Sequence, residues 1–155
     1  MLYLDASALV KRYIAEPGTF EVARAITEAC VVGTSIISRA ETAAALAKAV
    51  RVGTLTREAA ASALQVFRSD WPNLVRVQAT EVLIAQADTL AWELGLRGYD
   101  AVHLASALLC KESMGQEVTV ATFDQQLWAA AERSGLIPFP DDLPGMLAAW
   151  RTGVS

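Results

Sequence analysis

LYLDASAL, at residues 2–9, is the stretch that decides the fold. Its first three residues form an apolar run that predicts a short buried strand, and the acidic residue Asp5 follows the run directly. A helical pattern then begins after Ser7 and continues to Tyr13. The chain therefore opens with a strand that passes into a helix through a carboxylate.

The same alternation of strands and helices continues along the chain. Connections that contain a helix are too long for hairpins, so the strands are expected to pair in parallel through right-handed crossovers. This pattern predicts an α/β fold, a three-layer α/β/α sandwich with a central parallel sheet. Further strands are expected at residues 31–35, 75–77 and 117–123. Helices are expected at residues 20–29, 39–50, 57–68, 80–94, 100–112 and 124–134.

The length of 155 residues suits one domain with a single core. Hydrophobic residues make up 54% of the chain and charged residues 19%, which excludes a disordered protein because there is ample apolar surface to bury. Residues 1–136 are expected to form the main domain. Residues 137–155 contain three prolines and are expected to form a turn and a short terminal helix packed on the same domain.

The formal net charge of −4 argues against a protein that holds nucleic acid on a broad basic surface. If RNA binds here, cations must help. Every uncharged run is shorter than the roughly 18 apolar residues that a membrane span needs. We therefore expect a soluble protein that has no membrane partner.

The start of the chain and its cysteines indicate a cytoplasmic location. The strand-like opening meets Asp5 without a basic region or a cleavage site, so no signal peptide is visible. Cys30 and Cys110 lie in apolar company and lack the spacing of metal ligands. We interpret them as free buried thiols in a reducing compartment.

Four acidic residues stand where helices are expected to begin: Asp5, Glu41, Asp100 and Asp124. In a parallel sheet, residues that follow strands gather at one edge, and Asp100 can reach that edge from the start of the central helix. Each acid alone is equally well explained as a helix cap, stabilised by free N–H groups and the helix dipole. Ser38 and Glu41 also fit the Ser-x-x-Glu capping box.

The four acids together indicate a metal site. Carboxylates brought into one partly desolvated cleft repel one another strongly, so such a cluster needs a compensating cation. A site made of oxygen ligands suits Mg²⁺, with Mn²⁺ as a substitute, and fits zinc poorly. These cations also keep coordination positions for phosphate oxygens.

Four motifs carry a resemblance to a known family. Residues 2–9, 38–42, 98–105 (GYDAVHLA) and 122–127 (TFDQQL) resemble the motifs of PIN domains, in order and over nearly the whole chain. Their spacing looks most like that of the VapC-type toxins of bacterial toxin–antitoxin pairs. The resemblance implies a PIN-like nuclease domain over residues 1–136 and metal-dependent endoribonuclease activity on RNA. It also implies a homodimer and inhibition by a cognate antitoxin protein, with DNA contacted only through the antitoxin.

The resemblance and the chemistry of the acids suggest roles for individual residues. Asp5, Asp100 and Asp124 are expected to hold one or two cations, and Glu41 is expected to orient or deprotonate the attacking water. The resemblance to other metal nucleases of this kind implies 5′-phosphate and 3′-hydroxyl ends. The hydroxyl side chains of Ser7 and Thr122 are expected to support the acids. Ser7 fits the N-cap of the first helix equally well.

Other polar residues have simpler interpretations. His103 is expected to be a hydrogen-bonded structural histidine, because a mechanism that uses metal-activated water needs no titrating imidazole. Asp141 and Asp142 are interpreted as solvated turn acids. Four basic residues near the expected edge are candidate contacts to the RNA backbone, and solvated surface charge explains them as well: Lys11, Arg12, Arg39 and Arg97.

Two other functions remain open from the sequence. A phosphatase with an aspartyl nucleophile would also use Asp5, but its usual second acid is replaced by Ser7 here. A catalytically silent PIN fold that serves as an interaction module would normally lack one or more acids, and all four are present. For the antitoxin, we expect an amphipathic segment that lies across the cleft and inserts a basic side chain among the carboxylates.

Overall fold

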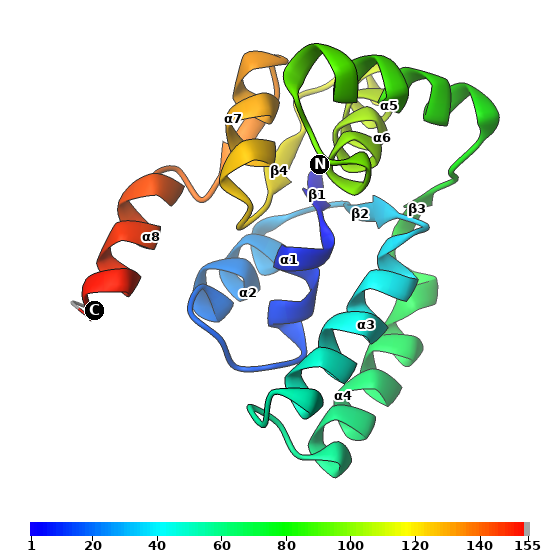
Figure 1. The fold of residues 1–155 in the computed structure, drawn as a ribbon. Coiled ribbons are helices and arrows are strands. Elements are labelled where there is room, and N and C mark those ends of the chain that lie inside the picture. The colour runs from blue at the N-terminus through cyan, green and yellow to red at the C-terminus, as the bar shows by residue number, and fades with distance from the viewer. Residues whose placement is uncertain (154–155) are drawn as a thin grey trace.

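Five short strands form one sheet that is parallel throughout, in the order β3-β2-β1-β4-β5. The computed structural model describes residues 1–153, and helices lie on both sides of the sheet (Figure 1). The predicted three-layer α/β/α sandwich with a parallel sheet is confirmed. The strands are β1 (Leu2–Leu4), β2 (Val32–Ser35), β3 (Val75–Val77), β4 (Thr119–Ala121) and β5 (Ile137–Phe139).

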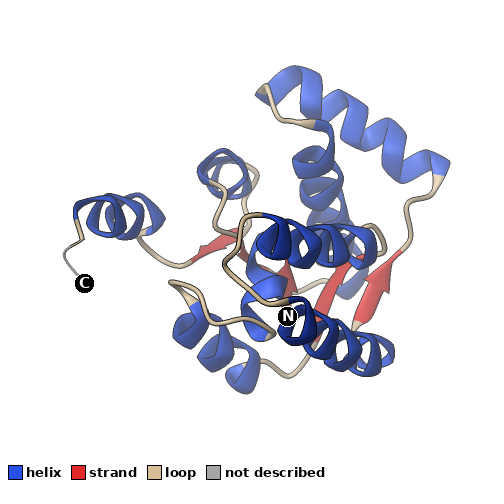
Figure 2. Ribbon diagram, turned by 60° about the horizontal axis from the view of Figure 1, so that its bottom comes forward, coloured by secondary structure: helices blue, strands red, loops and turns tan. Residues whose placement is uncertain are grey.

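Helices that lie close to the predicted ranges connect these strands, and a further helix follows β5. Within residues 1–153 they are α1 (Ala6–Leu9), η1 (Val10–Arg12), α2 (Thr19–Glu28), α3 (Ser38–Arg51), α4 (Arg57–Asp70), η2 (Trp71–Asn73), α5 (Glu81–Leu94), α6 (Gly98–Met114), α7 (Gln125–Arg133) and α8 (Leu143–Thr152). Helices α5, α6 and α7 cover one face of the sheet, and α1, α2 and α4 cover the other (Figures 1 and 2). No helix in this range is long and apolar enough to cross a membrane.

Strand β1 lies at the centre of the sheet and joins its two layers. Its successive side chains point to opposite faces, as in any strand. Tyr3 packs in the cluster that contains Leu104 of α6, whereas Leu2 and Leu4 pack in the cluster that contains Phe67 of α4. All three strand residues are buried, which explains why the sequence has an unbroken apolar run there. The carboxyl end of this strand presents Asp5 between the layers.

The fifth strand is a correction to the sequence prediction, which expected a turn after residue 136. Ile137 N–H donates to the Val118 carbonyl at 3.0 Å, and Thr122 N–H donates to the Phe139 carbonyl at 3.0 Å. Pro138 lies opposite Val120 in this register, on the strand at the edge of the sheet. Proline is tolerated there because its missing N–H falls on the side that has no neighbouring strand. Helix α8 (Leu143–Thr152) follows this strand, and the assignment of this helix to the same domain stays a prediction.

Candidate active site

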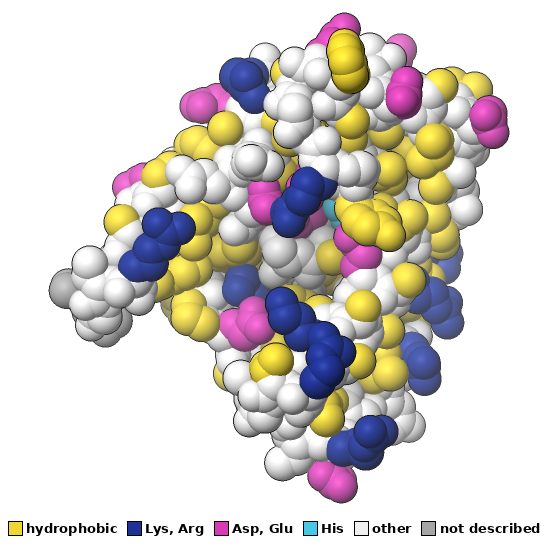
Figure 3. Space-filling model, viewed as in Figure 1, with side chains coloured by type: hydrophobic (Ala, Val, Ile, Leu, Met, Phe, Trp, Pro, Cys, Tyr) yellow, Lys and Arg dark blue, Asp and Glu magenta, His cyan; other side chains and the backbone are white. Residues whose placement is uncertain are grey.

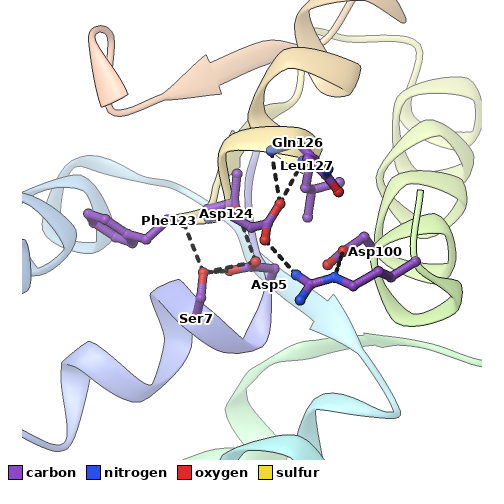
Figure 4. Close-up of polar contacts among 9 residues, drawn as sticks. Asp5, Ser7, Asp100, Phe123, Asp124, Gln126 and Leu127 are labelled. Carbon is purple, nitrogen blue, oxygen red and sulfur yellow. Dashed lines mark hydrogen bonds and ion pairs between the residues drawn. The ribbon is translucent and has the colours of Figure 1, made fainter. Parts of the chain in front are cut away.

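The four acids lie at the starts of four helices at the carboxyl edge of the sheet. Asp5 caps α1, accepting a hydrogen bond from Ala8 N–H at 2.8 Å. Asp124 caps α7, accepting from the backbone N–H groups of two α7 residues at 2.9 and 3.0 Å. Asp100 and Glu41 lie in the first turns of α6 and α3. The side chains of Asp5, Asp100 and Asp124 face a common space (Figure 4).

Asp5 is the most buried and most fully bonded of the four. Only 4% of the residue is exposed. Ser7 Oγ donates to its carboxylate at 2.7 Å, and Thr122 Oγ1 donates to the other carboxylate oxygen at 2.6 Å. Burial raises the pKa of the Asp5 carboxyl above its ordinary value, and the hydrogen bonds to the carboxylate oppose this rise. Both residues predicted to support the acids therefore contact Asp5 directly.

The two supporting hydroxyls also join Asp5 to the loop that carries Asp124. Thr122 Oγ1 accepts a hydrogen bond from Asp124 N–H at 3.1 Å while it donates to Asp5. Ser7 Oγ accepts from Phe123 N–H at 2.8 Å. The ends of β1 and β4, neighbours in the sheet but separated by more than 100 residues, are thereby fixed against each other.

Arg97 lies between the other two aspartates. Its Nε donates to Asp100 Oδ2 at 2.8 Å, and its Nη2 donates to Asp124 Oδ2. The Arg97 side chain is 68% exposed, whereas those of Asp100 and Asp124 are 10% and 25% exposed. Burial raises the pKa of Asp100, and the hydrogen bond from Arg97 opposes this rise. The charge balance that the sequence attributed to a metal is thus supplied here by a guanidinium of the chain itself.

Glu41 contacts the only histidine of the chain. Its Oε2 lies 2.8 Å from His103 Nε2. The predicted capping box is wrong, because Ser38 is already inside α3 and its hydroxyl pairs with Thr34 Oγ1 at 2.7 Å. Glu41 is thereby left free to point toward His103. His103 is 2% exposed and hydrogen-bonded through both ring nitrogens, as expected of a structural histidine.

The donor set fits a hard divalent cation. Within residues 1–153, no three Asp, Glu, His or Cys side chains converge closely enough to share one ion as they are placed. The carboxylates of Asp100 and Asp124 nevertheless share a positive group, and the carboxylate of Asp5 is linked through Thr122 to the backbone N–H of Asp124. Mg²⁺ and Mn²⁺ prefer such oxygen ligands, take few carboxylates directly and retain waters for the remaining positions. A cation in this place requires Arg97 to move aside.

The other basic residues proposed as RNA contacts differ in how free their charges are. Lys11 is buried, pairs with Glu16 at 3.0 Å and lies 4.4 Å from the centre of the Phe123 ring. Arg12 pairs with Asp70 at 3.1 Å, and both side chains are partly exposed. Arg39 is exposed and lies over the Trp71 ring. Figure 3 shows Lys and Arg side chains close to acidic ones on this face of the molecule.

Asp142, Trp128 and Trp150 have structural partners, whereas Asp141 is exposed and Trp92 is 90% exposed. Asp142 caps α8, since its carboxylate accepts from Gly145 N–H at 2.9 Å. Trp128 donates its indole N–H to the Pro140 carbonyl at 2.7 Å, and Trp150 stacks on Phe123. Cys30 is exposed and Cys110 is buried, so the prediction of two buried thiols is correct only for Cys110, although both are free.

Fold and acids together define the class of the protein. The profile of the PIN domain family matches residues 2–133, and the chain belongs to this family. It is 35% identical over 144 residues to Ribonuclease VapC45 of Mycobacterium tuberculosis, covering 92% of this chain and 97% of that protein. Ribonuclease VapC49 of the same species gives the same identity and coverage.

Solved structures share the fold at lower identity. PAE2754 from Pyrobaculum aerophilum has a TM-score of 0.62 and 24% identity, over 95% of this chain and 89% of that chain. FitAcB from Neisseria gonorrhoeae has a TM-score of 0.64 and 20% identity, over 91% of this chain and 98% of that chain. These likenesses are of fold alone, and they agree with the family assignment.

Proposed function

We propose that this chain is a metal-dependent endoribonuclease, the VapC-type toxin of a toxin–antitoxin pair, that hydrolyses RNA phosphodiesters. The observation that carries the proposal is the joining of Asp5, Asp100 and Asp124 at one edge of the sheet by Thr122 and Arg97. The names of the two relatives at 35% identity support the substrate class, since both are ribonucleases.

The three aspartates would hold Mg²⁺, or Mn²⁺ in its place. The bound cation supplies Lewis acidity, which makes water a better nucleophile and neutralises charge on the scissile phosphate. Glu41 orients the attacking water and accepts its proton. Arg97, once released from Asp100 and Asp124, is placed at the same edge with its charge free for the RNA backbone, as is the exposed side chain of Arg39. Arg12 would contact the RNA in exchange for its ion pair with Asp70. Lys11 is left out of this role because its ammonium is buried against Glu16.

The nucleophile and the leaving oxygen together determine the products. A mechanism through the RNA 2′-hydroxyl uses paired acid and base groups, often two histidines, and the sequence has one histidine, which is buried. Attack by water held on Glu41, with the 3′-oxygen of the preceding nucleotide as leaving group, would instead leave a 5′-phosphate and a 3′-hydroxyl. An aspartyl-nucleophile phosphatase is disfavoured, because both carboxylate oxygens of Asp5 are occupied by hydrogen bonds in a buried position.

An antitoxin protein would silence this site in the cytoplasm. The acids lie beside an apolar groove between α5 and α6, whose lining includes Ile84, Tyr99 and Val102, and hydrophobic side chains adjoin the charged centre of this face in Figure 3. An amphipathic segment of the antitoxin would lie in such a groove and place a basic side chain where Arg97 now lies. A homodimer, with DNA contacted only through the antitoxin, completes the proposed assembly. Among the structural neighbours is a toxin–antitoxin complex from Klebsiella pneumoniae.

Mapping of RNA ends tests the proposal. Total RNA from a bacterial host would be treated with purified protein in Mg²⁺, in Mn²⁺ and in chelator, and the new ends sequenced. We expect discrete cuts with 5′-phosphate ends in either metal, none in chelator and none with Asp5→Asn. A silent interaction module would give no cuts under any condition. The site found in this way supplies an RNA oligonucleotide for the kinetic tests below.

A further inference from the structure

A buried chain of hydrogen bonds lies behind Glu41. Tyr3 on β1 is fully buried, and its hydroxyl lies 2.9 Å from His103 Nδ1. His103 on α6 lies with its Nε2 2.8 Å from Glu41 Oε2 on α3. The Tyr3 and His103 rings meet edge to face, with centroids 6.0 Å apart and planes at 70°. Three separate elements of the fold thus converge on one carboxylate.

The chemistry of the three groups determines the direction of these hydrogen bonds. A tyrosine hydroxyl carries its proton at neutral pH. The proton of a buried hydroxyl needs an acceptor, and His103 Nδ1 lies within hydrogen-bond distance of it. With Nδ1 accepting, the neutral imidazole carries its proton on Nε2, which donates to the Glu41 carboxylate.

We infer that Tyr3 and His103 are positioning residues for the reaction: Tyr3 fixes the tautomer and ring orientation of His103, and His103 holds the Glu41 carboxylate toward the attacking water. This inference rests on the proposed function. The Glu41 side chain is 24% exposed, so it reaches solvent while His103 anchors it from the core. With Oε2 held by His103, Oε1 is the oxygen that faces the water.

The arrangement of these buried hydrogen bonds favours a positioning role for Tyr3 and His103 over a purely structural one. A flexible glutamate at a surface helix loses rotamer freedom when it must hold a water, and a prior anchor removes that cost from the reaction step. Apolar rings of similar size would fill the core as well as the rings of Tyr3 and His103 do. Instead, their polar atoms face one another and end on a group at the site.

Kinetics of three variants on the mapped RNA oligonucleotide test the inference. We expect His103→Leu to lower kcat about 10- to 100-fold with KM little changed, as for loss of an outer group that orients an active-site ligand. His103→Gln, which keeps an N–H donor near the Nε2 position, is expected to recover part of kcat. Tyr3→Phe removes only the hydroxyl and is expected to lower kcat by a smaller factor. Tyr13→Phe is the matched control, because it removes a hydroxyl bonded to Asp70 outside the chain of bonds, and it should leave kcat unchanged.

Nitrogen NMR of the single imidazole gives a readout that does not depend on cleavage. Since the chain has one histidine, the two ¹⁵N signals of His103 are assigned without ambiguity. We expect a protonated Nε2 and an unprotonated Nδ1 in the wild type, and a weaker preference in Tyr3→Phe, in which Glu41 alone still accepts from Nε2. A wild-type protein with the proton on Nδ1 would overturn the inference, whatever the protein cleaves.

The two proposals fail in distinguishable ways. A wild type that cuts no RNA in metal overturns the proposed function. A wild type that cuts RNA, with Tyr3→Phe and His103→Leu equally fast and still folded, overturns the positioning roles alone. If His103→Leu does not fold, Tyr3→Phe still tests the inference because it keeps the buried ring.

Discussion

The candidate site has two halves that are held in opposite ways. Asp5 is buried and bonded on both oxygens by Ser7, Thr122 and a helix N–H. Asp100 and Asp124 are joined instead by Arg97, whose side chain is mostly exposed. One half is therefore fixed by the sheet, whereas the other is closed by a cationic side chain of the protein, which the proposed metal, RNA or antitoxin would displace.

Removal of the charge from the fixed half should have the largest effect. Asp5→Asn keeps the shape of the side chain, but it removes one negative charge from the cation site and replaces one accepting oxygen with an NH₂ donor. We expect the cleavage rate to fall more than about 100-fold, the scale for loss of a preorganised electrostatic contact. Asp88→Asn, on the exposed surface of α5, is the matched control. Wild-type cleavage by Asp5→Asn would show that the fixed half does not take part in the reaction.

The second substitution weakens the hydrogen bonds around Asp5 without changing the charge of the site. Thr122→Val replaces the hydroxyl that donates to Asp5 and accepts from Asp124 N–H with a methyl group of similar size. A hydrogen bond to a charged buried group contributes about 1.5 to 3 kcal/mol to the free energy of unfolding, so a loss in this range is expected by denaturant titration. Thr27→Val, which loses an exposed bond within α2, is the control and should change stability far less.

A substitution in the half that contains Asp100 and Asp124 should strengthen cation binding. Arg97→Gln removes the side chain that competes with a cation for these carboxylates, so Mn²⁺ should bind more tightly. The measurement is calorimetry on the protein without RNA. Because Arg97 is exposed, its ion pairs contribute about 0.2 to 1 kcal/mol, which corresponds to an increase in affinity of roughly 1.5- to 5-fold. Arg57→Gln, an exposed arginine at the start of α4, controls for net charge. Weaker binding of Mn²⁺ to Arg97→Gln would mean that Arg97 supports the cation site instead of competing for it.

The smallest effect concerns pH in the metal-free protein. Burial raises the folded-state pKa of Asp5 and Asp100, so the folded chain binds these protons more tightly than the unfolded chain does. Their contribution to stability is therefore fully present below the ordinary carboxyl pKa and is lost as the pH rises through the raised values. Melting temperatures measured in chelator should decline over this range, and Asp5→Asn should flatten the decline. A wild-type melting temperature that rises with pH over this range, with no such rise in Asp5→Asn, would contradict the burial of these charges.

Local patterns in the sequence were enough to predict most of the fold. Apolar runs and helix periodicity predict β1 to β4 and the helices between them, and the order of these elements requires a parallel sheet. Strand β5 could not be predicted in this way, because Pro138 signals a turn and its strand pairing depends on β4, which is distant in the sequence. The boundary of the main domain at residue 136 stays a prediction.

In the site, too, the features set by local sequence were predictable, and the features that depend on contacts between distant residues were not. Helix starts predict the positions of the four acids, because capping and dipole effects are local. The position of Arg97 between Asp100 and Asp124 depends on the approach of α6 to α7, although its place three residues before Asp100 was a usable signal. The link from Tyr3 to His103 spans 100 residues, and no local pattern encodes it.

The rate of RNA cleavage as a function of free Mn²⁺ tests the central claim most directly. The protein is freed of metal with chelator, and the mapped oligonucleotide is then cut at increasing Mn²⁺ concentration by wild type and by Asp5→Asn. We predict no cleavage in chelator, a saturable rise for the wild type, and little activity of Asp5→Asn at any concentration. Cleavage by the wild type at its full rate in chelator would contradict the claim that these carboxylates act through a bound cation.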